Sequence, residues 1–257
     1  MKPDILDHKV LESMYSKSEL GNSYSFLLGI ASGVFISTGA FIFVMMLHLD
    51  FFSSLNRLFA SSTFSIGLIL IIFSKTQLFT GNNLMIRNLL SKNISGYMVL
   101  KNWTFVYLGN LIGALGFVVA LYFLSPTVLD ERFIEIAIHK LSLGTITTIY
   151  KAILCNILVC IAVALAIFFE KKLFKVIAIV IPITLFVFLG FEHSVANMFF
   201  VPMGLILKGD LSNMQLLLLL RNLSLVTFGN IAGGALVSLS LYFFLGAKVE
   251  RAEDKVH

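Results

Sequence analysis

One histidine of the chain lies inside a long apolar stretch, next to an acidic residue. His193 follows Glu192 in a polar turn, Phe191–Ser194, that interrupts the apolar run Val176–Gly190. Histidine is the side chain whose ordinary pKa lies nearest neutral pH, and an ionisable group within a membrane segment is a functional candidate. We expect His193 to share a proton with a small anion. Glu192 either takes part in this step or holds the backbone of the turn.

A second polar turn interrupts another apolar run. The run Leu58–Ser74 ends at Lys75–Asn83, which reads Lys-Thr-Gln-Leu-Phe-Thr-Gly-Asn-Asn. At membrane depth, such a break is tolerated only where its backbone is buried in protein or lines a wet cavity, and the new half-helix presents free N–H groups. We expect Thr80, Asn82 and Ser194 to cap the half-helices, with an anion favoured between the two turns. The alternative is that both turns only close buried loops.

The elements that position these turns are predicted to be membrane-spanning helices. The chain is 58% hydrophobic and only 13% charged, with 25 phenylalanines. Roughly 20 helical residues cross a bilayer, and uncharged runs of that length occupy residues 26–47, 103–129, 152–169 and 222–247. Together with the two interrupted runs, these predict an all-α membrane protein with six crossings. The lipid bilayer is the expected partner, and nucleic acid is not expected despite a net charge of +5.

The distribution of basic residues predicts the orientation. Of 19 lysines and arginines, 12 lie in the two tails and in the loops around 87–101 and 171–175, whereas the other loops hold five. Basic residues accumulate on the cytoplasmic side of membrane proteins. We therefore expect a multi-pass protein of the inner or plasma membrane, with both termini in the cytoplasm.

An internal repeat divides the chain into two halves. Residues Asn102–Gly113 match Asn222–Gly233 at a constant offset of 120. Each half holds three crossings, so the second must enter from the opposite face, and the functional path of such inverted repeats lies where the halves meet. The predicted single channel domain, 1–257, comprises a cytoplasmic tail 1–21, repeats 22–129 and 130–247, and a second cytoplasmic tail 248–257. Helices 2 and 5 are the broken ones.

Three motifs resemble the signature segments of the formate/nitrite transporter family. They are Leu78–Asn82, Gly190–Phe199 and Val226–Gly234, and the resemblance covers essentially the whole chain. It implies a homopentamer of aquaporin-like protomers. Each protomer would hold a pore for small monovalent anions, such as formate, nitrite or hydrosulfide, that move with a proton or as the neutral acid. Formate is our first expectation among them.

The resemblance also assigns residues to the pore. It makes His193 the central histidine and Thr80 the threonine of the first broken-helix loop. The lysines that attract anions match Lys17 in the cytoplasmic vestibule and Lys140 in the external one. The pore asparagines match Asn156 and Asn230, and the apolar constrictions match Phe64, Leu68, Phe79, Val159 and Phe186. One position departs from the family pattern, because Gln77 precedes Leu-Phe-Thr where an acidic residue is usual.

Two other classes of protein remain as alternatives. An aquaporin-like channel for neutral solutes would carry paired Asn-Pro-Ala turns, and this sequence has none. An intramembrane enzyme that uses Glu192 and His193 as acid and base would need a further nucleophile or metal ligands, and only Thr80 is available. Cys155 and Cys160 are interpreted as packing residues. We expect no metal, no cofactor and no enzymatic activity.

Overall fold

All regular secondary structure in the part of the chain that the structure describes is helical. The computed structural model describes residues 3–47, 55–124 and 131–246. Its α-helices are α1 (Pro3–Ser18), α2 (Asn22–Met46), α3 (Asn56–Thr63), α4 (Ser65–Ser74), α5 (Phe79–Asn82), α6 (Met85–Leu90), α7 (Gly96–Leu124), α8 (Arg132–Ser142), α9 (Thr145–Phe168), α10 (Lys172–Phe188), α11 (Ser194–Lys208) and α12 (Asn213–Leu241), and a π-helical turn, Tyr242–Gly246, follows α12.

Five helical stretches in these described ranges are long and apolar enough to cross a membrane. They are α2, α3 together with α4, α7, α9, and α12 with its extension to Leu245, and they contain between 19 and 33 residues. The shorter α11 has 15 residues and is also apolar. The prediction of an all-helical protein with several membrane-length helices is confirmed.

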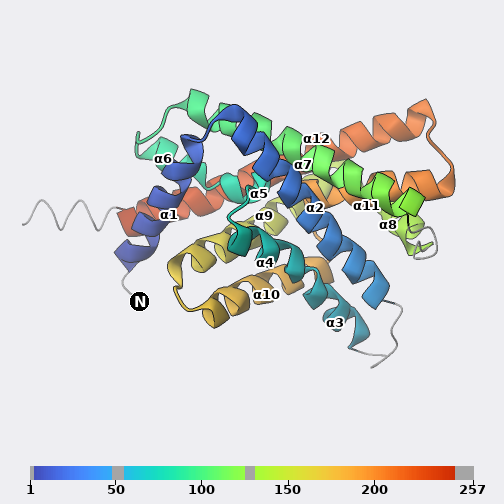
Figure 1. The fold of residues 1–257 in the computed structure, drawn as a ribbon, viewed down its shortest axis with the longest axis horizontal. Coiled ribbons are helices and arrows are strands. Elements are labelled where there is room, and N and C mark those ends of the chain that lie inside the picture. The colour runs from blue at the N-terminus through green and yellow to red at the C-terminus, as the bar shows by residue number, and fades with distance from the viewer. Residues whose placement is uncertain (1–2, 48–54, 125–130, 247–257) are drawn as a thin grey trace, which may run out of the picture.

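The long helices pack in pairs whose backbones touch. α2 lies along α7, and α9 lies along α12 (Figure 1). A Cβ added at Gly113 of α7 would stand 2.1 Å from the carbonyl oxygen of Ile30 on α2, and one at Gly233 of α12 would stand 2.4 Å from that of Ile153 on α9. Small residues permit such close helix contacts in membranes.

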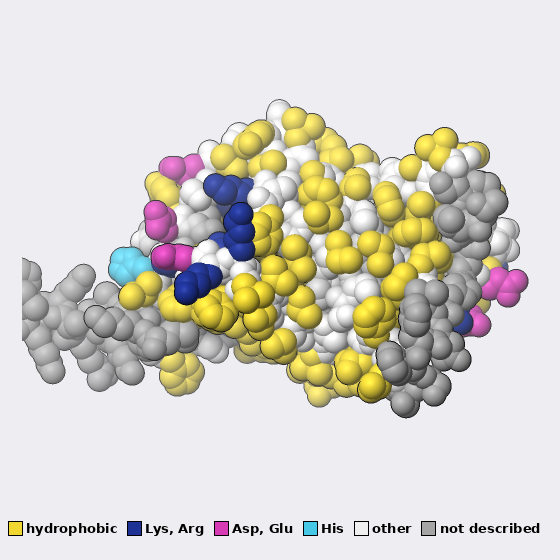
Figure 2. All heavy atoms as spheres, turned by 60° about the horizontal axis from the view of Figure 1, so that its bottom comes forward, with side chains coloured by type: hydrophobic (Ala, Val, Ile, Leu, Met, Phe, Trp, Pro, Cys, Tyr) yellow, Lys and Arg dark blue, Asp and Glu magenta, His cyan; other side chains and the backbone are white. Residues whose placement is uncertain are grey.

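The short helices gather at opposite ends of these pairs. α1 and α6 lie at one end, which we call the α1 end, and α8 lies at the other, which we call the α8 end (Figure 1). The start of α1 and the end of α12 are both at the α1 end (Figure 1). Between the two ends, Figure 2 shows a face covered mainly with apolar side chains, whereas charged side chains concentrate near the ends. Exposed apolar residues include Leu108, Ile181 and Leu217, and an apolar surface of this extent requires lipid or other subunits to cover it.

Irregular backbone separates α4 from α5 and α10 from α11, and we call these two segments the breaks. After α4, Lys75 adopts a left-handed conformation with φ 56°, and α5 begins at Phe79. After α10, Gly190 has φ 67°, a conformation that glycine adopts without steric cost, and α11 begins at Ser194. The run Leu58–Ser74 is itself divided, because α3 ends at Thr63 and α4 begins at Ser65.

Two helices have no counterpart among the predicted elements. The amino-terminal tail forms α1, which is fastened to α6 by Asp7 and Arg87: the Arg87 Nε donates to Asp7 Oδ1 at 2.8 Å, and each side chain is only 4% exposed. The segment before α9 forms α8, which packs against α11 through Phe133 and Gly204. Both helices are too short or too polar to register as crossings, so hydropathy alone does not reveal them.

Candidate functional site

His193 and Thr80 join the two interrupted segments in the core of the molecule. The Nε2 of His193 lies 2.9 Å from the Oγ1 of Thr80, and both residues are buried. The Nδ1 of His193 accepts the backbone N–H of Ala196 at 3.1 Å. Because Nδ1 accepts, the neutral ring carries its proton on Nε2 and donates it to Thr80. The tautomer of His193 therefore follows from its hydrogen bonds.

The prediction that Thr80, Asn82 and Ser194 cap the half-helices is wrong. The N-cap of α11 is His193 itself, and α5 starts after Leu78 without any side-chain cap. The hydroxyl of Ser194 is buried without a hydrogen-bond partner in the protein, and Thr80 turns to His193. The Nδ1 of His193 accepts a backbone N–H, as the side-chain oxygen of Ser, Thr, Asp or Asn usually does at an N-cap. Histidine is not among the residues that normally predict a cap, so the sequence did not indicate this one.

A pair of asparagines holds the two breaks in the same way. Asn110 on α7 accepts the N–H of Phe79 at 3.0 Å and donates to the carbonyls of Gly29 at 2.8 Å and Gln77 at 3.2 Å. Asn230, 120 residues later, accepts the N–H of Ser194 at 2.9 Å and donates to the carbonyls of Ala152 at 2.8 Å and Glu192 at 3.0 Å. Each amide thereby satisfies backbone groups that the break leaves without helical partners.

Asn156 connects the first break to α12. Its Nδ2 lies 2.6 Å from the carbonyl of Asn230, 2.9 Å from the Oδ1 of Asn83 and 3.3 Å from the carbonyl of Thr80. The residue is fully buried. Asn156 therefore bonds to neighbouring segments, which is one of the two roles expected for the mid-helix asparagines.

Two matching amide clusters lie beyond the breaks, one at each end of the molecule. At the α1 end, the Nδ2 of Asn82 donates to the Oε1 of Gln77 at 2.7 Å and to the Oδ1 of Asn102 at 2.9 Å. At the α8 end, the Nδ2 of Asn197 donates to the Oε2 of Glu192 at 2.7 Å and to the Oδ1 of Asn222 at 2.8 Å. Sequence reasoning missed these clusters, although the repeat offset pairs Asn102 with Asn222.

The two predicted vestibule lysines adjoin these clusters. Lys140 forms an ion pair with Glu192, with 2.9 Å between Nζ and Oε1. Lys17 donates to the Oδ1 of Asn82 at 3.0 Å. Burial at the end of α1 lowers the pKa of Lys17 to about 8, because removal from water disfavours the charged form.

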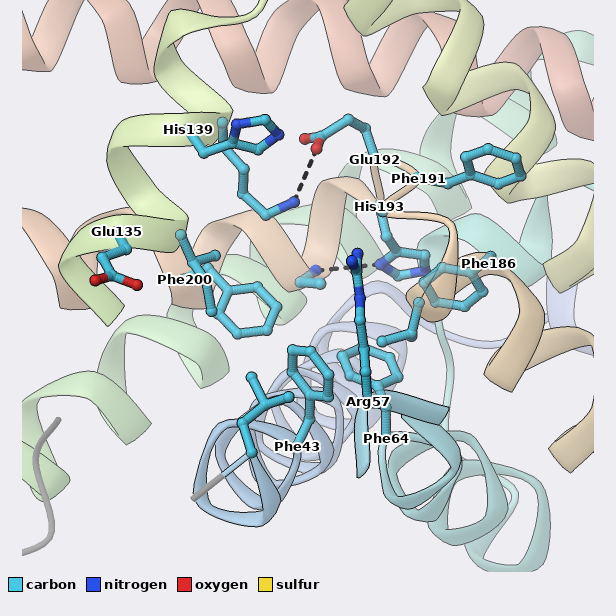
Figure 3. A pocket seen from close by; sticks show the side chains of 16 residues that line it. Phe43, Arg57, Phe64, Glu135, His139, Phe186, Phe191, Glu192, His193 and Phe200 are labelled. Atoms are coloured by element: carbon cyan, nitrogen blue, oxygen red, sulfur yellow. Dashed lines mark hydrogen bonds and ion pairs between the residues drawn. The ribbon is translucent and has the colours of Figure 1, made fainter. Parts of the chain in front are cut away.

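A cavity of about 390 Å³ opens at the α8 end and has His193 in its wall (Figure 3). Aromatic side chains make up much of the lining, including Phe43, Phe64, Phe186, Phe191 and Phe200. Lys140, His139 and Arg57 lie in its wall together with the carboxylates of Glu135 and Glu192, and the Arg57 side chain extends into the cavity in Figure 3. Sequence reasoning missed Arg57 and His139. Both belong to segments outside the recognised motifs, and only the fold brings them to this cavity.

The predicted constriction residues fall into two groups. Phe64 and Phe186 meet edge to face with centroids 5.6 Å apart, and the ring of Phe186 stacks on that of His193 at 5.9 Å. These two line the cavity, whereas Leu68, Phe79 and Val159 are buried elsewhere in the core. Phe79 packs edge to face on Tyr107, with centroids 4.9 Å apart.

The molecule combines helices of membrane length, buried and hydrogen-bonded polar residues within an apolar core, and a cavity with a buried histidine in its wall. These features define an integral membrane protein with an internal site. The family model described as "Formate/nitrite transporter" matches residues 6–244. The chain belongs to the formate/nitrite transporter family.

Individual relatives cover most of the chain. The uncharacterized transporter YrhG of Bacillus subtilis (strain 168) is 32% identical over 265 residues, which span 99% of this chain and 97% of the relative. The formate channel FocA of Escherichia coli (strain K12) is 33% identical over 237 residues, 83% of each chain. A solved pentameric formate channel with formate bound aligns with a TM-score of 0.75 at 27% identity, over 88% of this chain and 98% of that chain.

Proposed function

We propose that this protein is a membrane channel for small monovalent anions, formate first among them and nitrite or hydrosulfide as further candidates. The observation that carries the proposal is the His193–Thr80 contact, in which the two breaks meet at the inner end of a cavity with basic residues in its wall. Membership of the family supports it, as do relatives named as formate channels.

The proposed architecture is two inverted repeats of three crossings each, 22–129 and 130–247, with α3/α4 to α6 and α10/α11 as the broken helices of an aquaporin-like protomer. The identical bonding of Asn110 and Asn230 to the two breaks supports this symmetry. The tails are residues 1–21 and 248–257. Five protomers assemble side by side, as in the pentameric structure that this chain resembles, and lipid covers the remaining apolar surface.

The α1 end is proposed to face the cytoplasm and the α8 end the outside of the cell membrane. The first and last described segments both lie at the α1 end (Figure 1), as an even number of crossings requires. The basic loops around Lys92 and Lys172 follow the same assignment, since such loops stay on the cytoplasmic side.

In the proposed mechanism, Lys17 and Lys140 raise the anion concentration at the two ends of the path. A bare charge at the middle of a membrane costs at least about 2.5–3.5 kcal/mol, and Phe64 and Phe186 exclude water beside His193. A proton removes much of this cost by converting the anion to its neutral acid. The proton comes from water or through His193, whose Nε2 lies 2.9 Å from the hydroxyl of Thr80. The ring can supply a proton only from its imidazolium form, because removal of the Nε2–H from the neutral ring would leave an imidazolate. Glu192 keeps Lys140 in place, and its carboxylate is committed to Lys140 and Asn197.

Anion flux into liposomes that contain the purified protein tests this function. Formate, nitrite and hydrosulfide are supplied in turn with an inward pH gradient, and uptake is compared with that of protein-free liposomes and of a neutral solute such as glycerol. We expect saturable uptake of at least one anion, faster at lower external pH. Glycerol uptake without any anion uptake would instead establish a neutral-solute channel.

A further inference from the structure

Lys17 and Lys140 occupy equivalent places in the two halves of the molecule. The backbone carbonyl of Lys17 accepts from Asn102 at 3.2 Å, and that of Lys140 accepts from Asn222 at 3.1 Å. Asn102 and Asn222 belong to the two amide clusters and are related by the repeat offset of 120. The two lysines are thus fixed to the same framework, so a difference between their side-chain partners has a local cause.

The local cause is residue 77. Gln77 and Glu192 have the same role in their clusters, since each accepts from an asparagine at 2.7 Å through a side-chain oxygen. Their side chains have the same shape but differ in charge. Lys140 bonds the Glu192 carboxylate, whereas Lys17 bonds the amide oxygen of Asn82.

The unused oxygen in the second cluster supports this comparison. The Oδ1 of Asn197, which corresponds to the oxygen that Lys17 binds on Asn82, is buried without a hydrogen-bond partner in the protein. A lysine therefore selects the carboxylate where the framework supplies one. Lys17 takes an amide because Gln77 offers no charge.

Three carboxylates near the α1 end have other partners. Asp7 on α1 binds Arg87, Glu19 just after α1 accepts the hydroxyl of Tyr15, and Glu170 between α9 and α10 binds Lys9. In the described ranges Lys17 forms no ion pair, and its one side-chain hydrogen bond is to a neutral group. Its depressed pKa reflects burial that no counter-charge offsets. An ammonium held in this way favours an anion.

We propose that Lys17, beside Asn82 and Gln77, forms a binding site for one small carboxylate-like anion at the α1 end of the pore, and that Lys140 forms no equivalent site at the α8 end because its ammonium already pairs with Glu192. This inference rests on the proposed function for the identity of the anion. Formate carries the same carboxylate group as Glu192, so it can supply the negative charge that Gln77 lacks. The pore then binds anions more tightly from the α1 end than from the α8 end.

The test is Gln77→Glu, which keeps the shape of the side chain and the oxygen that accepts from Asn82, and adds the missing charge. It replaces the Nε2 that donates to Ser25 at 3.2 Å by an oxygen to which the Ser25 hydroxyl can donate. The purified wild-type protein, its oligomer size checked by gel filtration, is heated with increasing sodium formate, with sodium isethionate keeping the ionic strength constant. A ligand that binds the folded state raises the apparent melting temperature. We expect a saturable rise in the wild type and at least a tenfold weaker apparent affinity in Gln77→Glu, equivalent to about 1.4 kcal/mol.

Two lysine variants on α1 provide a second line of evidence. Lys17→Met removes the ammonium and is expected to abolish the formate effect. Lys9→Met removes a cation of the same helix that already pairs with Glu170 and is expected to keep it. If Gln77→Glu or Lys17→Met responds to formate as the wild type does, the proposed binding of the anion at Lys17 is wrong.

Sidedness separates this inference from the proposed function. In proteoliposomes with one orientation, the half-saturating formate concentration should be about tenfold lower from the α1 end, and Gln77→Glu should remove the difference. Equal values from both ends in the wild type would overturn the inference while leaving the channel function intact. If no anion is transported from either side, the proposed function fails, and formate stabilisation that depends on Gln77 and Lys17 would still establish the binding site.

Discussion

The replacement Asn230→Ala should separate the second break from the helices that hold it. It removes one acceptor and two donor contacts, which leaves the N–H of Ser194 and the carbonyls of Ala152 and Glu192 without this partner. Hydrogen bonds between membrane helices contribute on average about 0.6 and at most about 1.7 kcal/mol each. Three of them predict a loss of about 2–5 kcal/mol in the free energy of unfolding.

Unfolding in mixed micelles titrated with SDS measures this loss. Asn110→Ala, which removes the matching three contacts at the first break, is expected to cost a similar amount. Asn213→Ala is the control, because Asn213 lies on the same helix as Asn230 but is exposed at its start, and it should change stability by less than about 0.5 kcal/mol. A loss below about 1 kcal/mol for Asn230→Ala, or one no larger than that of the control, would refute the conclusion that Asn230 holds the second break in place.

Three further outcomes are expected. His193→Asn should abolish pH-dependent anion uptake and leave the oligomer intact, since asparagine can still accept at the N-cap; uptake with the wild-type rate and pH profile would reduce His193 to a structural residue. Gly113→Ala should destabilise the α2–α7 contact by about 1–3 kcal/mol, because its Cβ would meet a carbonyl at 2.1 Å, whereas Gly116→Ala, with nothing within 4 Å, should be tolerated; equal melting temperatures contradict this. Burial lowers the pKa of Lys17 from 10.5 to about 8, so anion uptake from the α1 end should fall as pH rises through about 8. Over the range from about 8 to 10.5, the folded state loses the proton before the unfolded state does, and the stability cost of burying the charged form disappears. A Lys17→Met variant with the same decline in uptake at alkaline pH would contradict this assignment.

The repeat in the sequence predicted more of the site than composition did. The offset of 120 paired Asn110 with Asn230, and the structure gives these residues matching hydrogen bonds. The apolar runs located the long helices, although α7 begins at Gly96, several residues before the predicted start at Trp103. Charged and polar first turns are invisible to hydropathy but extend a helix readily once its apolar part is buried.

Contacts that arise only from the packing of distant helices could not be predicted from the sequence. The sequence does not show that Arg57 and His139 line the same cavity, because that depends on how α3 and α8 pack in the fold. The cap of α11 was missed for a chemical reason. A histidine was considered for its proton, and only the geometry shows that its Nδ1 also holds a backbone N–H.

That cap restricts how a proton could pass through His193 in the proposed channel. A ring that relays protons from one side to the other receives a proton at one nitrogen and releases one from the other. The Nδ1 of His193 already accepts the backbone N–H of Ala196. Adding a proton there would free the first turn of α11 from its cap. The capped ring is neutral and can donate a hydrogen bond from Nε2, but it cannot give that proton away, because an imidazolate would remain. A continuous proton relay through His193 would therefore have to break the cap of α11 at every transfer.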